Sequence, residues 1–185
     1  DTLITNTISG IADIAFSDTE HGYAAGSSGL IMKTTDGGTT WTNHITSPTS
    51  TNLSLSLVND STLIVGGTYR IYKSTDNGNS WKTIMNAYDF GAIAFSSLQQ
   101  GSFLGEGGTI LNTGNAGTDW EEKSYGGTYF IKDAVYTTSL KGYAVGGVIQ
   151  GPPLETEFGT IIGTNDGGET WTEIQQSSYD DHYYS

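Results

Sequence analysis

Four tryptophans, each closing a similar octet, constrain the fold of this chain more than any other feature of its sequence. Successive tryptophans lie 40, 39 and 51 residues apart, and the octets share the pattern S/T-x-D/N-x-G-x-x-W. A repeat of about forty residues is typical of solenoids and propellers, in which each unit buries its core against its neighbours. We therefore expect a repeat protein. The octets are TTDGGTTW ending at Trp41, STDNGNSW ending at Trp81, TGNAGTDW ending at Trp120 and TNDGGETW ending at Trp171.

Each repeat also contains four short strand-like runs. In the first repeat they are IADIAF at 11–16, HGYAAG at 21–26, LIMKT at 30–34 and WTNHI at 41–45. Short apolar runs bounded by Gly, Asn and Ser predict strands, and no segment has a helical period. Four such strands joined by glycine turns describe one blade of an all-β propeller with antiparallel, four-stranded blades. We expect blades at 9–45, 46–85, 86–124 and 125–176, an orphan outer strand of a preceding blade at 1–8, and a flexible acidic and aromatic tail at 177–185.

The octet spans the predicted turn between the third and fourth strands of a blade. Its Asp or Asn can accept hydrogen bonds from turn amides, and its Gly can adopt the positive φ that other residues resist. The tryptophan is expected to pack into the seam between neighbouring blades. The octet occurs once in each of the four repeats, as expected of a structural motif, whereas an active site would need only one copy. We therefore assign the octets a structural role. Their assigned residues are Asp36, Trp41, Asp76, Trp81, Asn115, Trp120, Asp166 and Trp171.

The repeats resemble those of Asp-box proteins, also called bacterial neuraminidase repeats. The stretch AFSDTEHGYAAGSSGLIMKTTDGGTTW at 15–41 is most similar to the photosystem II stability and assembly factor-like subgroup. The resemblance implies a β-propeller and says little about function. It weakens in the second repeat, which is one residue shorter before Leu63, and in the third, where Asn115 replaces the aspartate and Ala116 the first glycine.

Four blades and an orphan strand leave two architectures open. One is a self-contained four-bladed ring with an extra edge strand. The other, which we favour, is part of a larger ring, or an arc that closes by association. An open arc would expose two apolar blade faces, and such patches invite partners. We therefore expect either self-association or further blades from the rest of the chain.

Composition excludes several partner classes. The net charge is −13, and the chain has one arginine and six lysines, so phosphate-driven binding to nucleic acid or anionic membranes is not expected. Absent cysteines exclude disulfides, Cys–zinc sites and thiol catalysis. No apolar run reaches the length of about eighteen residues that a membrane-spanning helix needs, so membrane insertion is not expected. Abundant Ser, Thr, Asn and Gly with few lysines suggest an exported bacterial protein, extracellular, at the cell surface or periplasmic.

The rim opposite the octets is expected to carry the ligand-binding residues, because propeller ligands usually bind there. That rim is formed by the entries to the inner strands and by the turns between second and third strands. Asp13 and Asp133 align with each other, whereas the other repeats have Ser54 and Ala92 there, so the repeat does not require these carboxylates. The stretch IQGPPLETEF at 149–158 is an insertion, and loops that depart from a rigid scaffold often bind ligands. The full candidate set is Asp13, Tyr69, Arg70, Glu106, Tyr125, Tyr129, Asp133, Glu155 and Glu157.

The sequence supports an enzymatic function less well than a binding function. The resemblance suggests sialidase activity, but such a site clamps the substrate carboxylate with several arginines, and this chain has Arg70 alone. A glycoside hydrolase needs two carboxylates about 5–5.5 Å apart if it retains the anomeric configuration, or about 6.5–9.5 Å apart if it inverts it. Asp13 and Asp133 could supply them if the ring closed after four blades, so this reading stays an alternative.

No cofactor is predicted. The histidines His21, His44 and His182 are scattered and lack metal-ligand spacing, and no EF-hand-like loop is present. A structural Ca²⁺ on the acidic rim is the one cation left open. The sequence therefore predicts a non-enzymatic binding or scaffold module that recognises a protein or carbohydrate ligand on the rim opposite the octets.

Overall fold

A computed structural model describes residues 10–45, 51–86, 90–127, 129–150 and 156–178 of the chain. This part is all-β apart from two short 3₁₀ turns, η1 (Ser27–Gly29) and η2 (Glu106–Gly108). Its sixteen strands form four antiparallel sheets of four strands each. The orphan strand expected at 1–8 and residues 179–185 of the expected tail lie outside the described residues.

The sheets follow one another along the chain, and the strands of each sheet are ordered as in the sequence. Blade 1 comprises β1 (Ile11–Phe16), β2 (Gly22–Gly26), β3 (Leu30–Thr34) and β4 (Thr42–Ile45). Blade 2 comprises β5 (Asn52–Leu57), β6 (Leu63–Gly67), β7 (Arg70–Ser74) and β8 (Lys82–Asn86). Blade 3 comprises β9 (Phe90–Phe95), β10 (Gly101–Gly105), β11 (Thr109–Thr113) and β12 (Glu121–Ser124). Blade 4 comprises β13 (Phe130–Tyr136), β14 (Gly142–Gln150), β15 (Thr156–Thr164) and β16 (Thr172–Ser178).

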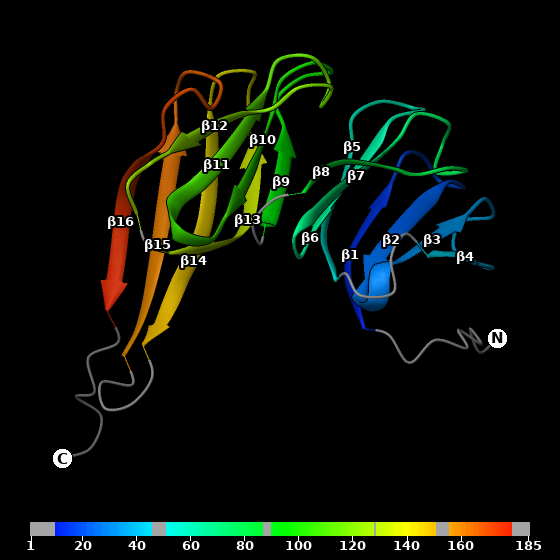
Figure 1. Ribbon diagram of the computed structural model, residues 1–185, viewed down its shortest axis with the longest axis horizontal. Coiled ribbons are helices and arrows are strands. Elements are labelled where there is room, and N and C mark those ends of the chain that lie inside the picture. The colour runs from blue at the N-terminus through cyan, green and yellow to red at the C-terminus, as the bar shows by residue number, and fades with distance from the viewer. Residues whose placement is uncertain (1–9, 46–50, 87–89, 128, 151–155, 179–185) are drawn as a thin grey trace.

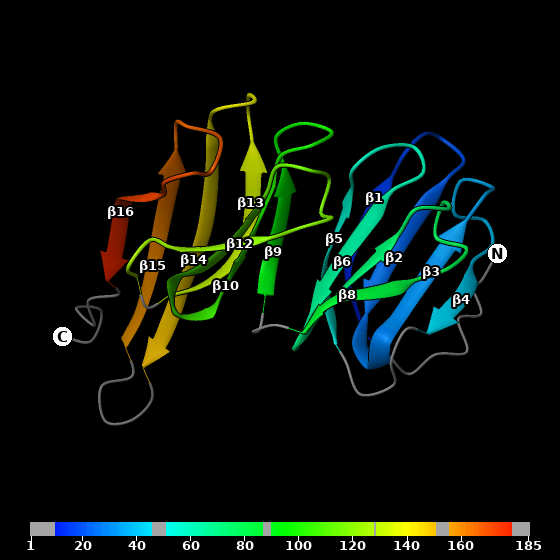
Figure 2. The same ribbon diagram turned by 45° about the horizontal axis from the view of Figure 1, so that its top comes forward.

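The four blades form an open arc. Their first strands, β1, β5, β9 and β13, contact one another in that order. Blades 1 and 4 lie at opposite ends of the assembly in both views (Figure 1, Figure 2). The predicted propeller of four-stranded blades is confirmed, and it is a partial ring rather than a ring closed after four blades.

The apolar core lies between the blades. Alternation along each strand sends one set of side chains to the preceding blade and the other to the following blade. Each of the three seams holds one buried cluster, and a fourth cluster, Ala24, Leu30 and Met32, lies within blade 1. Tyr23, Ala25 and Ile31 meet Leu55, Leu63 and Val65 in the first seam. Val58, Ile64 and Ile71 meet Phe90, Ile93, Phe103 and Leu111 in the second. Ala92, Leu104 and Ile110 meet Ile131, Ala144, Ile162 and Trp171 in the third.

Each octet forms the turn between the third and fourth strands. In the first, one oxygen of Asp36 accepts the backbone N–H of Thr40 at 2.8 Å, and the other accepts its hydroxyl at 2.6 Å. The Thr34 hydroxyl donates to Asp36 at 2.8 Å and accepts the N–H of Gly38 at 2.9 Å. These bonds lower the pKa of Asp36, the hydroxyl of Thr40 contributing most. The turn is thereby held by side chains within the octet.

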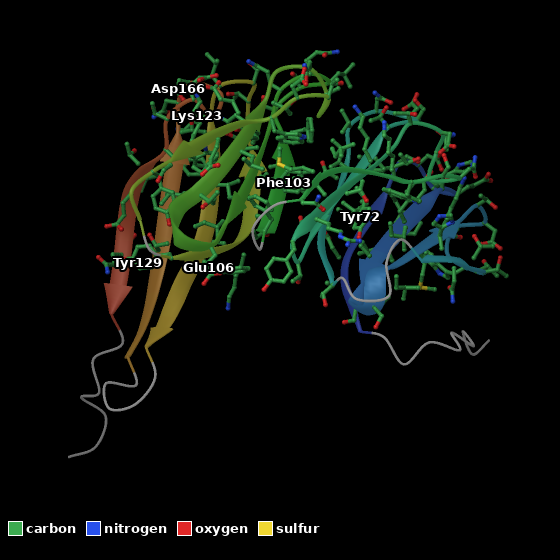
Figure 3. The ribbon with its side chains drawn as sticks, in the orientation of Figure 1. Tyr72, Phe103, Glu106, Lys123, Tyr129 and Asp166 are labelled. Atoms are coloured by element: carbon green, nitrogen blue, oxygen red, sulfur yellow. The ribbon has the colours of Figure 1, made fainter. Side chains whose placement is uncertain are left out.

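The turns separate into two rims. Each octet turn donates a backbone N–H to the turn between the first two strands of its own blade, as Gly37 does to the carbonyl of Glu20 at 2.9 Å and Ala116 to that of Gln99 at 2.9 Å. Figure 3 shows Glu106 and Tyr129 on the edge opposite Asp166 and Lys123.

The insertion at 149–158 departs from the expected loop. Residues 149–150 continue β14 and residues 156–158 belong to β15, where Ile149 pairs with Glu157 and Gln150 with Thr156. The described residues of the insertion therefore lengthen a hairpin, because their backbone groups continue the antiparallel ladder. Glu157 lies in β15, whereas Glu155 lies outside the described residues.

Candidate functional site

Tyr69 is the most unusual residue on the rim opposite the octets. It lies in the two-residue turn between β6 and β7, where Gly67 pairs with Arg70. Its φ is +62° and its side chain is 65% exposed. Bulky residues with positive φ are rare because Cβ crowds the backbone. In the corresponding turns of blades 1 and 3, a glycine, Gly29 or Gly108, is among the positive-φ residues.

The turn that holds Tyr69 is tied to a neighbouring strand. The N–H of Thr68 donates to the carbonyl of Thr51 at 2.8 Å, which ties the turn to the entry of the inner strand β5. Arg70, the only arginine of the chain, begins β7 and is half-buried. Tyr69 and Arg70, which are adjacent in the sequence, therefore lie at the same point of the rim.

Glu106, Tyr125 and Tyr129 belong to the part of the rim formed by blades 3 and 4. Glu106 is exposed and begins the η2 turn. The N–H of Tyr125 donates to the carbonyl of Gly108 at 3.3 Å, so the connection between these blades is fastened to that turn. Burial raises the pKa of Tyr125 above its usual value. Glu106 and Tyr129 lie on the same edge of the arc (Figure 3).

Asp13 has a role between blades that sequence reasoning missed. One of its oxygens accepts the N–H of Leu55 in blade 2 at 2.7 Å, and the other accepts the N–H of Ile14 at 2.8 Å. Ser54 occupies the same position in blade 2, and its hydroxyl accepts the N–H of Ile93 in blade 3 at 3.0 Å. This position therefore fastens one inner strand to the next.

Asp13 and Asp133 are not brought together. They belong to β1 and β13, and β5 and β9 lie between those strands. Asp133 instead accepts the N–H of the adjacent Ala134 at 2.8 Å. The pairing of these carboxylates required closure after four blades, and the open arc does not provide it (Figure 1).

A polar cavity of about 330 Å³ lies between the octet turns of blades 3 and 4. It is on the octet rim, where no ligand-binding residue was predicted. Its lining includes Asn112, Asp119, Trp120 and Glu169. Lys123 joins the carboxylates of Glu121, at 2.8 Å, and Glu169, at 3.5 Å, nearby.

The cavity lies where blade 3 departs from the repeat by having an asparagine in place of a lysine. At the position of Asn112, blades 1 and 2 have lysines that cross their seams. Lys33 donates to the side-chain oxygen of Asn79 at 3.1 Å, and Lys73 donates to the carbonyl of Ala116 at 2.7 Å. The shorter Asn112 reaches the carbonyl of Gly168 instead. The change from LIMKT and RIYKS to TILNT is the sequence signal that could have revealed it.

The described residues offer neither a metal site nor a membrane-spanning helix. Among the described residues, no three His, Asp or Glu side chains are grouped so that they could hold a metal ion. Nor does this part of the chain contain a helix with the length and apolar character to cross a bilayer. His21 pairs with Asp18 at 2.9 Å within one turn. The structural Ca²⁺ stays a prediction.

Octet turns closed by tryptophans, repeated in successive four-stranded sheets, define the class of protein. Three of these tryptophans, Trp81, Trp120 and Trp171, pack in the seams. The chain is an Asp-box β-propeller that resembles photosystem II stability and assembly factors. The family model described as "Photosynthesis system II assembly factor YCF48" matches residues 2–89. A curated relative, the photosystem II assembly lipoprotein Ycf48 of Synechococcus sp. (strain CC9902), is 23% identical over 175 residues, covering 89% of this chain and 49% of the relative. The chain thus spans about half the length of that relative.

Solved structures support the fold. YCF48 bound to a D1 peptide superposes with a TM-score of 0.56 at 16% identity, covering 91% of this chain and 83% of that one. An ancestral GH74 enzyme superposes with a TM-score of 0.69 at 16% identity, covering 89% of this chain and 24% of that one. Identities this low establish a shared propeller fold and no shared activity.

Proposed function

We propose that this chain is a protein-binding scaffold module whose recognition surface is the rim opposite the octets, with Tyr69 as its anchor. The observation that carries the proposal is an exposed tyrosine held at positive φ. That conformation costs an L-residue about 1–2 kcal/mol, and glycine would avoid the cost. Backbone strain of this kind is concentrated at functional sites, and tyrosine is enriched among binding hot spots.

Two further observations support a protein ligand. The solved relative described as YCF48 bound to a D1 peptide shares this fold, so a propeller of this type can hold a peptide. The net charge of −13 favours a partner segment that carries positive charge. We assign Arg70, Glu106, Tyr125 and Tyr129 to the surrounding contact surface. We also propose Glu155 and Glu157 as contact residues.

The test compares Tyr69→Gly with the unchanged chain. Calorimetric titration with a synthetic D1 peptide should show affinity lower by about tenfold or more in the variant, as expected for a hot-spot residue. Thermal stability should be equal or higher, because glycine relieves the strained φ. Leu140→Ala is the matched control, since Leu140 is 56% exposed in a turn on the other rim. Equal peptide affinity in the unchanged chain and Tyr69→Gly would sink the proposal.

Finer features of the function are part of the same proposal. A carbohydrate ligand is the rival on this rim, and saturable binding of oligosaccharides in place of peptide would favour it. We also propose that the protein is exported to the cell surface or periplasm. The low lysine content supports this, and so does the description of the curated relative as a lipoprotein. Finally, an open arc is expected to acquire a neighbour at its ends, either a second copy or further blades.

A further inference from the structure

In each of the first two seams, a lysine of the third strand places its ammonium group on the octet turn of the next blade. Nζ of Lys33 donates to Oδ1 of Asn79 at 3.1 Å. Nζ of Lys73 donates to the carbonyl of Ala116 at 2.7 Å and to the hydroxyl of Thr118 at 3.5 Å. Asn79 and Thr118 stand two residues before the closing tryptophan of their octets, and Ala116 stands four before it. These two octet positions therefore form an ammonium site.

The third seam has the same two acceptor positions but an asparagine in place of the lysine. In the fourth octet the positions are Gly167 and Glu169, and both line the polar cavity of about 330 Å³. The carbonyl of Gly167 accepts the hydroxyl of Tyr136 at 3.2 Å, and a carbonyl oxygen can accept a second hydrogen bond. Asn112 directs its amide to the carbonyl of Gly168 instead. The cavity thus lies where the other seams hold an ammonium group.

The walls of the cavity suit a cation better than the first two seams do. Glu169 supplies a carboxylate at a position where those seams have a neutral amide or hydroxyl oxygen, and charged acceptors form stronger hydrogen bonds. Asp119 and Glu121 also line the cavity. Trp120 lines it too, and an indole ring packs well against the aliphatic stem or the charged end of an alkylammonium group.

Lys123 balances only part of this negative charge. Its Nζ lies 2.8 Å from Glu121 and 3.5 Å from Glu169, but among the described residues it is not one of those that line the cavity. Asp119 accepts a neutral donor, the side-chain amide of Asn115, at 2.9 Å. The three carboxylates therefore outnumber the one ammonium group that pairs with them, and the net charge of −13 adds to the attraction for a further cation.

We propose that this cavity binds an alkylammonium group from outside the chain, carried by a lysine side chain of a partner protein or by a free polyamine. The ammonium group donates to the carbonyl of Gly167 and the carboxylate of Glu169, as the lysines do in the first two seams, and its stem packs on Trp120. The site lies on the octet rim, where Figure 3 shows Lys123. It is separate from the surface around Tyr69 and does not depend on it.

The test titrates the chain with n-butylamine, which has the stem and charge of a lysine side chain, at physiological ionic strength. Binding is followed by the NMR signal of the Trp120 indole, and n-butanol is the uncharged counterpart of the probe. Butylammonium should shift this signal saturably, whereas butanol should not.

Glu169→Gln removes the charged acceptor and should raise the half-saturation concentration of butylammonium about two- to fivefold, as expected for one exposed ion pair. The matched control is Glu122→Gln, which makes the same change at an exposed residue of β12 outside the cavity and should leave this concentration unchanged.

Two substitutions of opposite kind sharpen the test. Asn112→Lys restores the lysine of the first two seams, so the chain's own ammonium group should fill the cavity and abolish the shift. Lys123→Gln removes the cation that competes for Glu169 and should lower the half-saturation concentration. If Asn112→Lys does not fold, the opposite effects of Glu169→Gln and Lys123→Gln still decide the matter.

The two sources of the ammonium group are distinguished with probes of equal charge. Tighter binding of an acetylated and amidated Lys-Gly-Lys peptide than of putrescine indicates a lysine of a partner protein, and the reverse order indicates a free polyamine. The proposal is overturned if butanol shifts the Trp120 signal as much as butylammonium does. It is also overturned if Glu169→Gln and Glu122→Gln change the half-saturation concentration equally.

Discussion

The third octet and the other three reach the same turn by opposite hydrogen bonds. In the first, second and fourth octets, an aspartate accepts the hydroxyl four residues later, as Asp166 accepts that of Thr170 at 2.5 Å. In the third, the side-chain amide of Asn115 donates to the carboxylate of Asp119 at 2.9 Å. Donor and acceptor have exchanged places. The turn requires a bond between these two positions and not a particular residue at either.

The third octet is also the least suited in its backbone. Ala116 has φ +57°, where the first and fourth octets have Gly37 and Gly167. Alanine resists this conformation and glycine does not. The tryptophan of the same octet, Trp120, packs against Phe103 at 4.9 Å between ring centroids. Packing of Trp120 in the seam therefore stabilises a turn that the sequence of the third octet favours less than the other octets do.

The largest expected effect comes from the tryptophans. Trp171 is 5% exposed and packs against Tyr136, whereas Trp120 is only half-buried but contacts Phe95 and Phe103. If the seam supports the third turn, Trp120→Ala and Trp171→Ala should each lower the free energy of unfolding by about 3–5 kcal/mol. Urea denaturation measures both. A loss at Trp120 well below that at Trp171 would show that the second seam gives the third turn no such support.

The exchanged hydrogen bond should behave as a coupled pair. Asn115→Asp places two carboxylates together and removes the donor, so it should destabilise the protein by about 1 kcal/mol. Adding Asp119→Thr supplies a hydroxyl donor and recreates the arrangement of the first and fourth octets. The double variant should recover most of the loss. A double-mutant cycle of urea midpoints checks this, and simple additivity of the two single changes would refute the exchange.

Exchange of alanine and glycine at the positive-φ position should change stability in opposite directions in the third and fourth octets. Ala116→Gly relieves positive φ and should stabilise the protein by about 0.5–1 kcal/mol, part of the gain being offset by the greater freedom of glycine in the unfolded chain. Gly167→Ala introduces the same strain, and its new Cβ would lie 3.3 Å from the carbonyl oxygen of Ser139. It should destabilise. Loss of stability in Ala116→Gly would show that the third turn carries no strain.

The sequence predicted what is local and repeated. Alternating apolar residues placed the strands, and the octets placed their turns, because both patterns depend on neighbours within a few residues. The Asn115 substitution was visible, but its compensation by Asp119 was not recognised, since only the loss of the aspartate was considered.

Contacts between blades could not be predicted in the same way. Asp13 looked like a rim carboxylate because its partner, the N–H of Leu55, lies 42 residues away and is a backbone group. The cavity beside Asn112 depends on the absence of a lysine from one seam, which matters only once blades are stacked. Such features follow from the spacing of whole sheets rather than from any short pattern.

The smallest expected effect is the loss of stability at acidic pH that arises from the octet aspartates. Hydrogen bonds from Ser80, its hydroxyl first, hold the pKa of Asp76 at about 2. At Asp166, desolvation acts to raise the pKa, but the bonds from Thr170 and Thr164 outweigh it and the pKa is again about 2. An unfolded aspartate has a pKa of about 3.9, so the folded state binds these protons less tightly. The stability contributed by both carboxylates is therefore present above about pH 4 and is lost as pH falls toward 2.

Because both carboxylates are largely exposed, solvent screening keeps this loss small. Urea midpoints measured from pH about 5 to about 2.5 should fall less steeply in Asp76→Asn and Asp166→Asn than in the unchanged chain. Asp60→Asn removes an exposed turn carboxylate outside the octets and serves as the control for net charge. An acid dependence that is equally steep in all variants would mean that the octet hydrogen bonds do not distinguish the folded carboxylates from the unfolded ones.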